Sequence, residues 1–505
     1  MDGAPRPLVG IAGTGLMGRG IAQVAAQAGF DTLLYDTRAG TAAAAREAIV
    51  AQLERLAEKG KLTGAAALEA GARLKPVQSL ADFAGCGVVI EAIVEDLQAK
   101  CELFRALERV VAPSCLLATN TSSLSVTAIA AACARPERVG GFHFFSPVPL
   151  MKIVEVIEGV RSDPSVAERL TEIARAFGHV PVRAKDTPGF LVNHAGRAYG
   201  TEALRIHSEG IADFRTIDEV LREAAGFRMG PFELLDLTGL DVSQPVMESI
   251  YHQFHEEPRF RPSPLLLQRK LAGLLGRKSG RGFYAYEDGM KRVPAAAPPP
   301  PAPPEAKVWV SRAAPARPAL EALVAKLGAH VDAAARPAAD AICLLAPRDS
   351  DATTAALAEG VDPRRSVAID GEFGLATRRT LMTTPITDPA VRDAAHGLLA
   401  ADGVPVSVIH DSPGFIAPRV VAQVVNVACD IAQQAIATPE DIDRAVTLGL
   451  GYRQGPLAMG DALGPARILA LLQGLLAFYG DPRYRPSPWL TRRARLGVAL
   501  STPEG

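Results

Sequence analysis

The sequence predicts an α/β Rossmann-like domain plus an all-α domain, followed by a degenerate α/β unit and a second all-α repeat. Short apolar runs alternate with helical segments from residue 8 to about residue 185. The strand-like runs then stop, and residues 190–275 show helical periodicity. Motifs from this helical segment return near the end of the chain at a constant spacing, which indicates an internal duplication.

The composition is typical of a soluble globular protein and excludes several classes of function. Of the 505 residues, 48% are hydrophobic and 22% are charged. The formal net charge of -1 gives no overall field that would attract nucleic acid or an anionic membrane. The six cysteines contain no C-x-x-C pair, so we expect reduced thiols in a cytoplasmic protein and no metal site. We expect neither a signal peptide nor a membrane span.

Apolar runs in the first part of the chain predict a parallel sheet. The runs are short and almost continuously apolar, as in strands whose two faces are both covered by helices. They are "LVGIA" (8–12), "TLLYD" (32–36), "GVVIEAI" (87–93), "CLLATN" (115–120) and "VGGFHFF" (139–145). Three further runs after residue 306 predict a smaller sheet: "KVWVSR" (307–312), "AICLLAP" (341–347) and "SVAIDGEF" (366–373).

Repeated motifs divide the rest of the chain. "KDTPGFLVN" (185–193) matches "HDSPGFIAP" (410–418) at an offset of 225, and "RFRPSPLL" (259–266) matches "RYRPSPWL" (483–490) at an offset of 224. The proline run before residue 306 predicts an extended linker. The expected segments are a Rossmann domain (1–185), a helical domain (186–286), a linker (287–306), a degenerate α/β domain (307–405) and a second helical domain (406–505).

A glycine-rich loop predicts a dinucleotide site. Gly13, Gly15 and Gly18 follow the first strand and open a helix, with Leu16 and Met17 inside the same turn. Asp36 ends the next strand, 23 residues after Gly13, where an acid meets the ribose hydroxyls of the adenosine. Its charge favours NAD over NADP, although Arg38 close by leaves NADP open. The alternative is a glycine turn that binds no ligand.

The segment 139–156 predicts a paired histidine and glutamate. His143 and Glu155 lie in two apolar runs joined by "SPVPLM", and the midpoint between them is Pro149. A reversal there places the two residues opposite each other on antiparallel strands, with Cβ atoms about 5 Å apart. A buried carboxylate needs a partner, and this one could orient the imidazole as a general base. The alternative is a histidine satisfied by the backbone, with the glutamate at a sheet edge.

Polar residues follow another strand in "ATNTSSLS" (118–125). The end of a parallel strand is where ligands bind in open α/β sheets. The hydroxyl and amide groups could therefore position a substrate oxygen or the nicotinamide ribose. A polar turn that caps a helix is the alternative.

These motifs together resemble the 3-hydroxyacyl-CoA dehydrogenase family. The resemblance rests on "GTGLMGRGIA", "IEAIVED", "TNTSSLS", "GFHFFSPVPLMKIVEV", "KDTPGFLVN", "GFRMGPFELLDLTGLD" and "GRKSGRGFY", and it is dense over residues 8–286. It implies a reversible, NAD-dependent oxidation of L-3-hydroxyacyl-CoA to 3-oxoacyl-CoA. It also implies that His143 is the catalytic base, that Glu155 orients it, that Ser122 binds the C3 oxygen and that Asn193 holds the thioester or enolate-like oxygen.

The resemblance assigns further contacts and shows departures. The positions that it implies for NAD are Glu95, Lys100, Asn120, Ser122, Ser146 and Lys278, and the position that it implies for the CoA nucleotide is Lys59. Ser146 stands where the family usually has asparagine, which shortens the reach toward the nicotinamide. His194 follows Asn193 where the family has arginine, and we expect it on a helix surface.

The second half is expected to be catalytically silent. The 307–405 domain has no glycine fingerprint, its "RRTLMTTP" (378–385) stands where "VGGFHFFSP" stood, and Pro418 takes the place of Asn193. We expect residues 406–495 to pack on 186–286 as an intramolecular pseudo-dimer, with a homo-oligomer as the alternative.

The acyl group is not readable from the sequence. The resemblance favours 3-hydroxybutyryl-CoA or 3-hydroxyadipyl-CoA, in fatty acid β-oxidation or phenylacetate catabolism. Two alternatives remain: another β-hydroxyacid dehydrogenase, or a crystallin-like protein that binds NAD without turnover.

Overall fold

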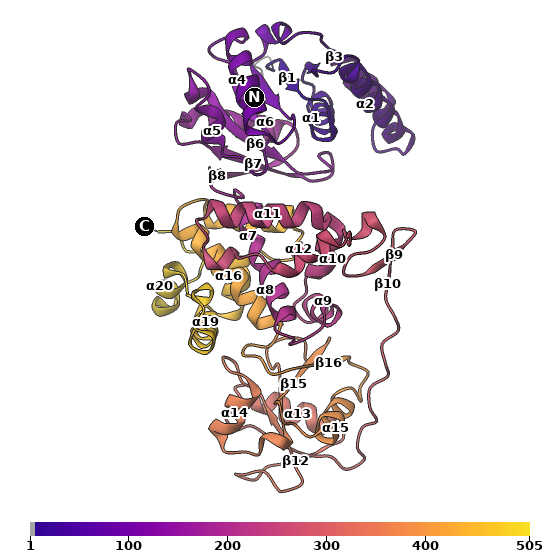
Figure 1. The fold of residues 1–505 in the computed structure, drawn as a ribbon, viewed down its shortest axis with the longest axis vertical. Helices are drawn as coiled ribbons and strands as arrows, with labels where there is room; N and C mark the ends of the chain where they lie inside the picture. The colour runs from indigo at the N-terminus through magenta and orange to yellow at the C-terminus, as the bar shows by residue number, and fades with distance from the viewer. Residues whose placement is uncertain (1–5, 505) are drawn as a thin grey trace. The chain divides into compact units, whose positions relative to one another are not determined.

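The computed structural model describes residues 6–504 and divides them into two compact units (Figure 1). The first unit contains the described residues up to His194, together with Gln434–Gly451. The second unit contains Ala195–Gln433 and Tyr452–Gly505 as far as they are described. The chain therefore passes from the first unit to the second after His194, returns to the first at Gln434 and enters the second again at Tyr452.

The first unit is built on an eight-stranded sheet in the order β3-β2-β1-β4-β5-β6-β7-β8. Every neighbouring pair is parallel except β6–β7, which is antiparallel. The predicted strands are confirmed, while the short β3 and the half-exposed β8 were not predicted. The strands are β1 (Val9–Ala12), β2 (Thr32–Tyr35), β3 (Leu74–Pro76), β4 (Val88–Glu91), β5 (Leu116–Thr119), β6 (Val139–Phe144), β7 (Ile153–Glu158) and β8 (Val180–Lys185).

Helices cover this sheet and complete a Rossmann-like domain. The core buries strand residues against the apolar faces of the helices, with Ile11, Ile90 and Phe142 fully buried. This explains why the strands are apolar on both faces. The helices are α1 (Leu16–Gln27), α2 (Thr41–Glu58), α3 (Gly64–Ala72), α4 (Leu97–Val110), α5 (Val126–Ala130), α6 (Pro164–Ala176), α7 (Val192–Ala195) and α17 (Pro439–Gly449), with 3-10 turns η1 (Leu80–Gly85) and η2 (Pro136–Arg138).

The second unit contains both helical repeats. Its first-repeat helices are α8 (Arg197–Ser208), α9 (Phe214–Glu223), α10 (Pro231–Thr238), α11 (Leu240–Gln253) and α12 (Pro264–Leu271), with η3 (Pro258–Phe260) and η4 (Arg277–Ser279). Its second-repeat helices are α16 (Ala417–Gln433), α18 (Pro456–Leu463), α19 (Pro465–Tyr479) and α20 (Pro488–Leu496), with η6 (Pro482–Tyr484). Within residues 6–504 no single helix is long and apolar enough to cross a membrane, and only α18 and α19, bent by 96°, pass that test as a pair.

A six-stranded sheet, β12-β11-β13-β14-β15-β16, also belongs to the second unit. The β14–β15 pair is antiparallel and the other pairs are parallel. The strands are β11 (Lys307–Val310), β12 (His330–Asp332), β13 (Ile342–Leu345), β14 (Ser366–Ile369), β15 (Arg379–Thr383) and β16 (Val406–Ile409). The helices are α13 (Arg317–Lys326), α14 (Ala352–Glu359) and α15 (Pro389–Leu399), with η5 (Pro363–Arg365). A hairpin, β9 (Ala285–Glu287) and β10 (Met290–Arg292), precedes the proline-rich stretch.

This second sheet corrects the predicted place of "RRTLMTTP". The segment forms β15, which lies between an antiparallel and a parallel neighbour as β7 does. It therefore corresponds to β7, and β14 corresponds to β6. The prediction was wrong because sequence order alone could not reveal that the second domain has lost one strand between β11 and β14.

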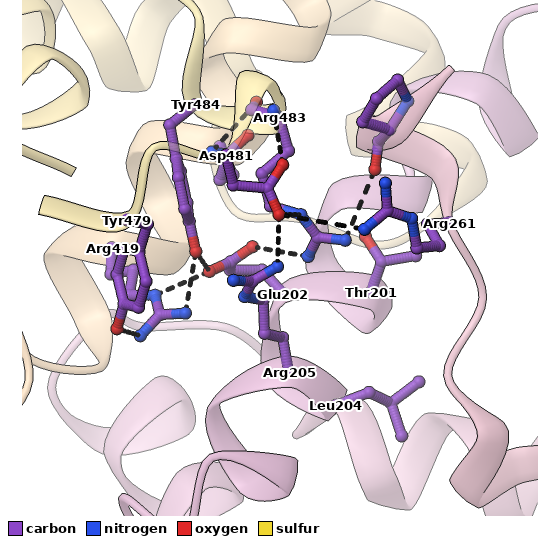
Figure 2. Close-up of polar contacts among 12 residues, drawn as sticks. Thr201, Glu202, Leu204, Arg205, Arg261, Arg419, Tyr479, Asp481, Arg483 and Tyr484 are labelled. Carbon is purple, nitrogen blue, oxygen red and sulfur yellow. Dashed lines mark hydrogen bonds and ion pairs between the residues drawn. The ribbon is translucent and has the colours of Figure 1, made fainter. Parts of the chain in front are cut away.

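The two helical repeats pack on each other within the second unit, α8 against α16 and η3 against η6. Figure 2 shows the buried polar network between them. Arg419 on α16 is fully buried and donates to Glu202 on α8 (Nε–Oε1 2.6 Å) and to the hydroxyl of Tyr484 (2.8 Å). Contacts are reciprocal, because Arg259 donates to the carbonyl of Arg485 and Arg483 to that of Pro258. Such reciprocity is the pattern of a two-fold interface.

The two α/β sheets are completed by crossed segments. In the first unit, the amide of Lys185 at the end of β8 donates to the carbonyl of Ile436 (2.9 Å). In the second unit, the amide of His410 after β16 donates to the carbonyl of Ile211 (2.9 Å). The two donors lie 225 positions apart in the sequence, and so do the two acceptors, so the two bonds are equivalent in the repeat. Each sheet is thus extended by a loop of the opposite helical repeat.

Candidate active site

The glycine loop after β1 has room for a dinucleotide. Gly13 has a φ of +97°, and a Cβ there would lie 2.5 Å from the carbonyl oxygen of Ala92. A Cβ on Gly18 would lie 1.9 Å from the carbonyl oxygen of Gly13, so α1 can approach the strand only with glycine. At Gly15, by contrast, a Cβ would meet nothing within 4 Å. The second glycine of the motif therefore faces open space, as close approach of a pyrophosphate requires.

Asp36, the residue expected to contact the ribose, also holds this loop in place. Its Oδ2 accepts hydrogen bonds from the amide and the hydroxyl of Thr14, both at 3.0 Å. Although partial burial by itself would raise the pKa of Asp36, these bonds and the amide of Arg38 lower it. The carboxylate is therefore charged at neutral pH. The helix α1 has no side-chain cap and no acidic residue in its first turn, which leaves its N-terminus suited to a phosphate. These residues fit NAD.

We expect Gly15→Ala to weaken NADH binding without loss of stability. The new methyl group would occupy the open space at Gly15 and would contact no atom of residues 6–504 within 4 Å. A loss of affinity of roughly tenfold, about 1.4 kcal/mol, is expected from displaced phosphate contacts. Fluorescence titration with NADH and a thermal melt measure the two effects. Gly64→Ala, where a Cβ also meets nothing, is the matched control. Equal NADH affinity in the two variants would contradict this role for the loop.

His143 and Glu155 lie opposite each other on β6 and β7. The register pairs them directly, which confirms the reversal predicted around Pro149. His143 Nδ1 is 2.6 Å from Glu155 Oε2, and the imidazole is 5% exposed while the carboxylate is fully buried. Because the carboxylate accepts, Nδ1 carries the proton, and Nε2 is left as the basic nitrogen.

The second oxygen of Glu155 is also bound. Its Oε1 accepts hydrogen bonds from the amides of Leu191 (2.9 Å) and Val192 (2.7 Å), which lead into α7. A Cβ on Gly449, in the last turn of α17, would lie 2.9 Å from a methyl group of Val192. The segment 434–451 from the second repeat therefore packs directly behind the residues that hold the carboxylate. No local sequence signal predicts this support.

Glu95 organises the loop after β5. Its Oε1 accepts hydrogen bonds from the hydroxyl of Thr121 (2.7 Å) and from the amides of Ser122 (2.9 Å) and Ser123 (3.1 Å). Burial by itself would raise the pKa of Glu95, but the Thr121 hydroxyl, the charge of Lys100, the Ser122 amide and the Ser123 hydroxyl lower it to about 2. Glu95 therefore stays ionised and fixes the position of Ser122.

Lys100 is buried and paired with two acids. Its Nζ lies 2.6 Å from Glu91 Oε1 and 3.3 Å from Glu95 Oε2. Glu91, the last residue of β4, also accepts from the hydroxyl of Thr119 on β5 (2.7 Å). Asn120 accepts a hydrogen bond from the amide of Phe144 (2.9 Å), which ties this loop to β6. Glu91 was not predicted, although a carboxylate at the end of an apolar strand is the signal that could have found it.

A cavity of about 330 Å³ brings several of the predicted residues together. It lies at the carboxyl ends of the central strands, as expected for a ligand site in an open α/β sheet. Seven predicted residues line it: Met17, Glu95, Lys100, Asn120, Ser122, His143 and Ser146. Ser146 is exposed at its rim.

Other predicted residues lie outside this cavity. Lys59 is exposed at the end of α2, and Leu16 is 66% exposed in the first turn of α1. Lys278 belongs to the second unit, where it pairs with Asp241. Asn193 follows Val192 in α7 and is half-buried. The prediction that His194 lies on a helix surface was wrong: it is 1% exposed, because α7 is a short helix enclosed by the fold.

Two protein-family models match this chain. The family described as "3-hydroxyacyl-CoA dehydrogenase, NAD binding domain" matches residues 8–187. The family described as "3-hydroxyacyl-CoA dehydrogenase, C-terminal domain" matches twice, at residues 189–286 and 414–501. The double match confirms the predicted repeat of the helical region.

Individual relatives match over different lengths. The 3-hydroxyadipyl-CoA dehydrogenase of Escherichia coli K12 is 39% identical over 97% of this chain and 97% of its own length. The 3-hydroxybutyryl-CoA dehydrogenase of Bradyrhizobium diazoefficiens is 40% identical over 57% of this chain and 97% of its own. A crystal structure of 3-hydroxybutyryl-CoA dehydrogenase from Escherichia coli K12 has a TM-score of 0.85 and 37% identity, and the match covers 98% of this chain and 99% of that one.

Proposed function

Because this chain belongs to the 3-hydroxyacyl-CoA dehydrogenase family, we propose that it interconverts L-3-hydroxyacyl-CoA and 3-oxoacyl-CoA with NAD. The observation that carries the proposal is the His143–Glu155 pair, whose imidazole lines a cavity beside the glycine loop. The names of the full-length relatives favour a 3-hydroxyadipyl or 3-hydroxybutyryl substrate. The enzyme is thus an NAD-dependent oxidoreductase of acyl-CoA metabolism.

His143 is the general base of this proposal. Its Nε2 takes the proton of the C3 hydroxyl as the C3 hydride departs, and returns it in the reverse direction. When bound, NAD supplies the acceptor for that hydride. Glu155 holds the imidazole through Nδ1 and offsets the positive charge that develops on the ring. Since both oxygens of Glu155 are hydrogen-bonded and the group is fully buried, its geometry is fixed before substrate binds.

Ser122 positions the C3 oxygen in this proposal. Its hydroxyl lies 3.3 Å from Glu95 Oε1 and its amide donates to the same oxygen. Gly13, Gly15, Gly18 and Asp36 are proposed to hold the adenosine diphosphate half of NAD, and Asn120, Lys100 and Ser146 the nicotinamide side. Asn193 is proposed to contact the thioester oxygen, Lys59 the CoA nucleotide and Lys278 the cofactor. Alignment by these groups contributes to rate beyond the proton transfer itself.

The test is NADH oxidation with 3-oxoacyl-CoA substrates of different length, including a dicarboxylic one. We expect kcat/KM to be highest for either the four-carbon substrate or the six-carbon dicarboxylic one. Matched uncharged substrates of six carbons separate chain length from the second carboxylate. The proposal fails if no 3-oxoacyl-CoA is reduced. It also fails if free 3-oxo acids are reduced with the same kcat/KM as their CoA thioesters.

The helical repeats are proposed to form an intramolecular pseudo-dimer. The reciprocal contacts between α8 and α16, and between η3 and η6, support it. One relative is about half as long as this chain, and its match covers 57% of this chain and 97% of its own length. The second half of this chain would then replace a second copy of the first. None of the six cysteines, all of which lie within the described residues, forms a disulfide, which is consistent with a cytoplasmic location that we also propose.

We expect a fragment ending at residue 290 to self-associate or aggregate and to lose activity. It would lack α16, which covers α8, and Gln434–Gly451, which belongs to the first unit. The apolar faces left uncovered would drive association. Light scattering gives the mass of the fragment, and NADH oxidation gives its activity, with the full chain as reference. A monomeric fragment with full activity would contradict the pseudo-dimer.

A further inference from the structure

A second cavity, of about 480 Å³, lies in the second unit. It is formed by loops at the carboxyl ends of β11, β13 and β14 together with α18 and α19 of the second repeat. Its walls include Phe373, Pro418, Leu463 and Leu471. A volume of this size is typical of a small-molecule site. None of its lining residues belongs to the candidate active site of the first unit.

The loop after β13 occupies the place that the Ser122 loop has in the first domain. In the first domain, Asp186 accepts hydrogen bonds from the amides of Val126 and Thr127 at the start of α5. In the second, Asp411 accepts from the amides of Ala352 and Thr353 at the start of α14. Since Asp186 and Asp411 are repeat equivalents, α14 corresponds to α5. Ser125 caps α5 and Asp351 caps α14. Ser122 and Arg348 each stand three residues before these caps, so Arg348 corresponds to Ser122.

Asp370 occupies the place of the catalytic histidine. The β14–β15 register pairs Ile369 with Leu381, so Asp370, one residue further, faces Thr380. Thr380 lies 225 positions after Glu155, the offset of the repeat. The pair Asp370–Thr380 therefore replaces His143–Glu155, and Pro418 replaces Asn193. The second cavity corresponds to the substrate end of the first domain, with different chemistry.

One carboxylate oxygen in a small recess beside this cavity has no partner among residues 6–504. Asp370 is 2% exposed and lines a recess shared with Arg348 and Pro418. Its Oδ1 accepts hydrogen bonds from the amides of Glu372 and Phe373, both at 3.0 Å. Across residues 6–504, no group donates to its Oδ2. An unpartnered buried polar atom is costly, and a bound molecule is one way in which it is satisfied.

Two arginines supply positive charge at the mouth of the cavity. Arg348 Nε lies 3.0 Å from Glu372 Oε1, and Arg467 Nη1 lies 3.8 Å from the same oxygen. The two guanidinium groups thus share one carboxylate. Two further acids, Asp349 and Glu359, line the wall, and Glu359 accepts from the hydroxyl of Ser311 (2.5 Å). Burial raises the pKa of Asp370 to about 7, so near neutral pH a protonated carboxyl can donate from Oδ2.

We propose that this cavity binds a small aliphatic carboxylic acid, with its carboxylate between Arg348 in the cavity wall and Asp370 in the adjoining recess. The aliphatic chain would lie against Leu463, Leu471 and Pro418. The site has a cation where the first domain has the Ser122 hydroxyl, so it recognises an anionic head and not a neutral C3 oxygen. No histidine is among the described residues that line it. The second α/β domain is therefore a ligand-binding domain and not a vestige.

Calorimetric titration of the full chain with hexanoate tests this proposal. A ligand of about eight heavy atoms is expected to bind with a Kd of roughly 1 mM. Hexan-1-ol, which has the same chain without the charge, should bind at least about tenfold more weakly because it cannot pair with the guanidinium. No saturable binding of hexanoate, or equal binding of the alcohol, would overturn the proposal.

Matched variants locate the binding. Arg348→Gln should weaken hexanoate binding about tenfold while leaving dehydrogenase turnover unchanged, because Arg348 does not line the first cavity. Arg364→Gln, at an exposed arginine of the same domain outside the cavity, should leave binding unchanged. Should Arg348→Gln fail to fold, Arg467→Gln, at a side chain that is 53% exposed, should weaken binding about threefold. Hexanoate binding that neither cavity variant weakens would overturn the assignment.

Discussion

The variant His143→Gln is expected to bind NADH with unchanged affinity and to lose about 10²–10⁴ in kcat. Glutamine can still donate a hydrogen bond to Glu155, but its amide cannot accept the hydroxyl proton. The fold should be kept, because Glu155 retains the amides of Leu191 and Val192. Steady-state NADH oxidation measures the loss, and fluorescence titration measures cofactor binding.

His330→Gln is the control for this variant. His330 is an exposed residue of β12 in the second α/β domain, so its replacement should change neither kcat nor NADH binding. Glu155→Gln should lower kcat as well, but by a smaller factor. The imidazole can still act as the base, but it loses the carboxylate charge that stabilises its protonated form. Wild-type kcat in the His143→Gln variant would refute the assignment of the base.

The largest expected effect on stability is that of Arg419→Met. Arg419 is fully buried and pairs with Glu202 (2.6 Å) and Glu209 (2.9 Å), as Figure 2 shows for Glu202. Removing the guanidinium leaves Glu202 buried with the hydroxyl of Tyr484 and a longer contact to Arg483. Loss of one partner of a buried ion pair costs about 3–5 kcal/mol. We expect the second unit to unfold at a clearly lower denaturant concentration.

Tryptophan fluorescence can follow this unfolding selectively. The chain has two tryptophans, Trp309 and Trp489, and both lie in the second unit. Arg495→Met, at an exposed arginine of α20, is the matched control and should shift the midpoint little. The double variant Arg419→Met, Glu202→Leu should recover part of the loss, because the acid is no longer left without its cation. Equal midpoints for Arg419→Met and Arg495→Met would show that the network does not hold the repeats together.

Much of the first domain could be predicted because its signals are local. A strand, a glycine turn, a helix and an acid at the end of the next strand are all contained in residues 9–36. The pairing of His143 with Glu155 was also predictable, since a reversal at the midpoint of two apolar runs fixes the register. The short strands β3 and β12 carry too few residues for a period-two pattern to be recognised.

Contacts between distant segments were not predictable. Glu91 looks like the polar end of a strand until the fold brings Lys100 and Thr119 to it. His194 looks exposed on a helix pattern, but the fold buries it. "RRTLMTTP" was matched to the wrong strand of the first domain, because the second sheet lacks one strand. Sequence order alone cannot show where such a deletion lies.

The sequence by itself determined the family, the order of the domains, the cofactor loop and the paired imidazole and carboxylate, because each depends on residues close together in the chain. Only the tertiary structure decided that residues 434–451 complete the first unit, that Arg419 joins the repeats, and that Arg348 and Asp370 share a cavity. The physical reason is that these arrangements come from packing between segments far apart in sequence, which leaves no periodic or motif signal in either segment alone.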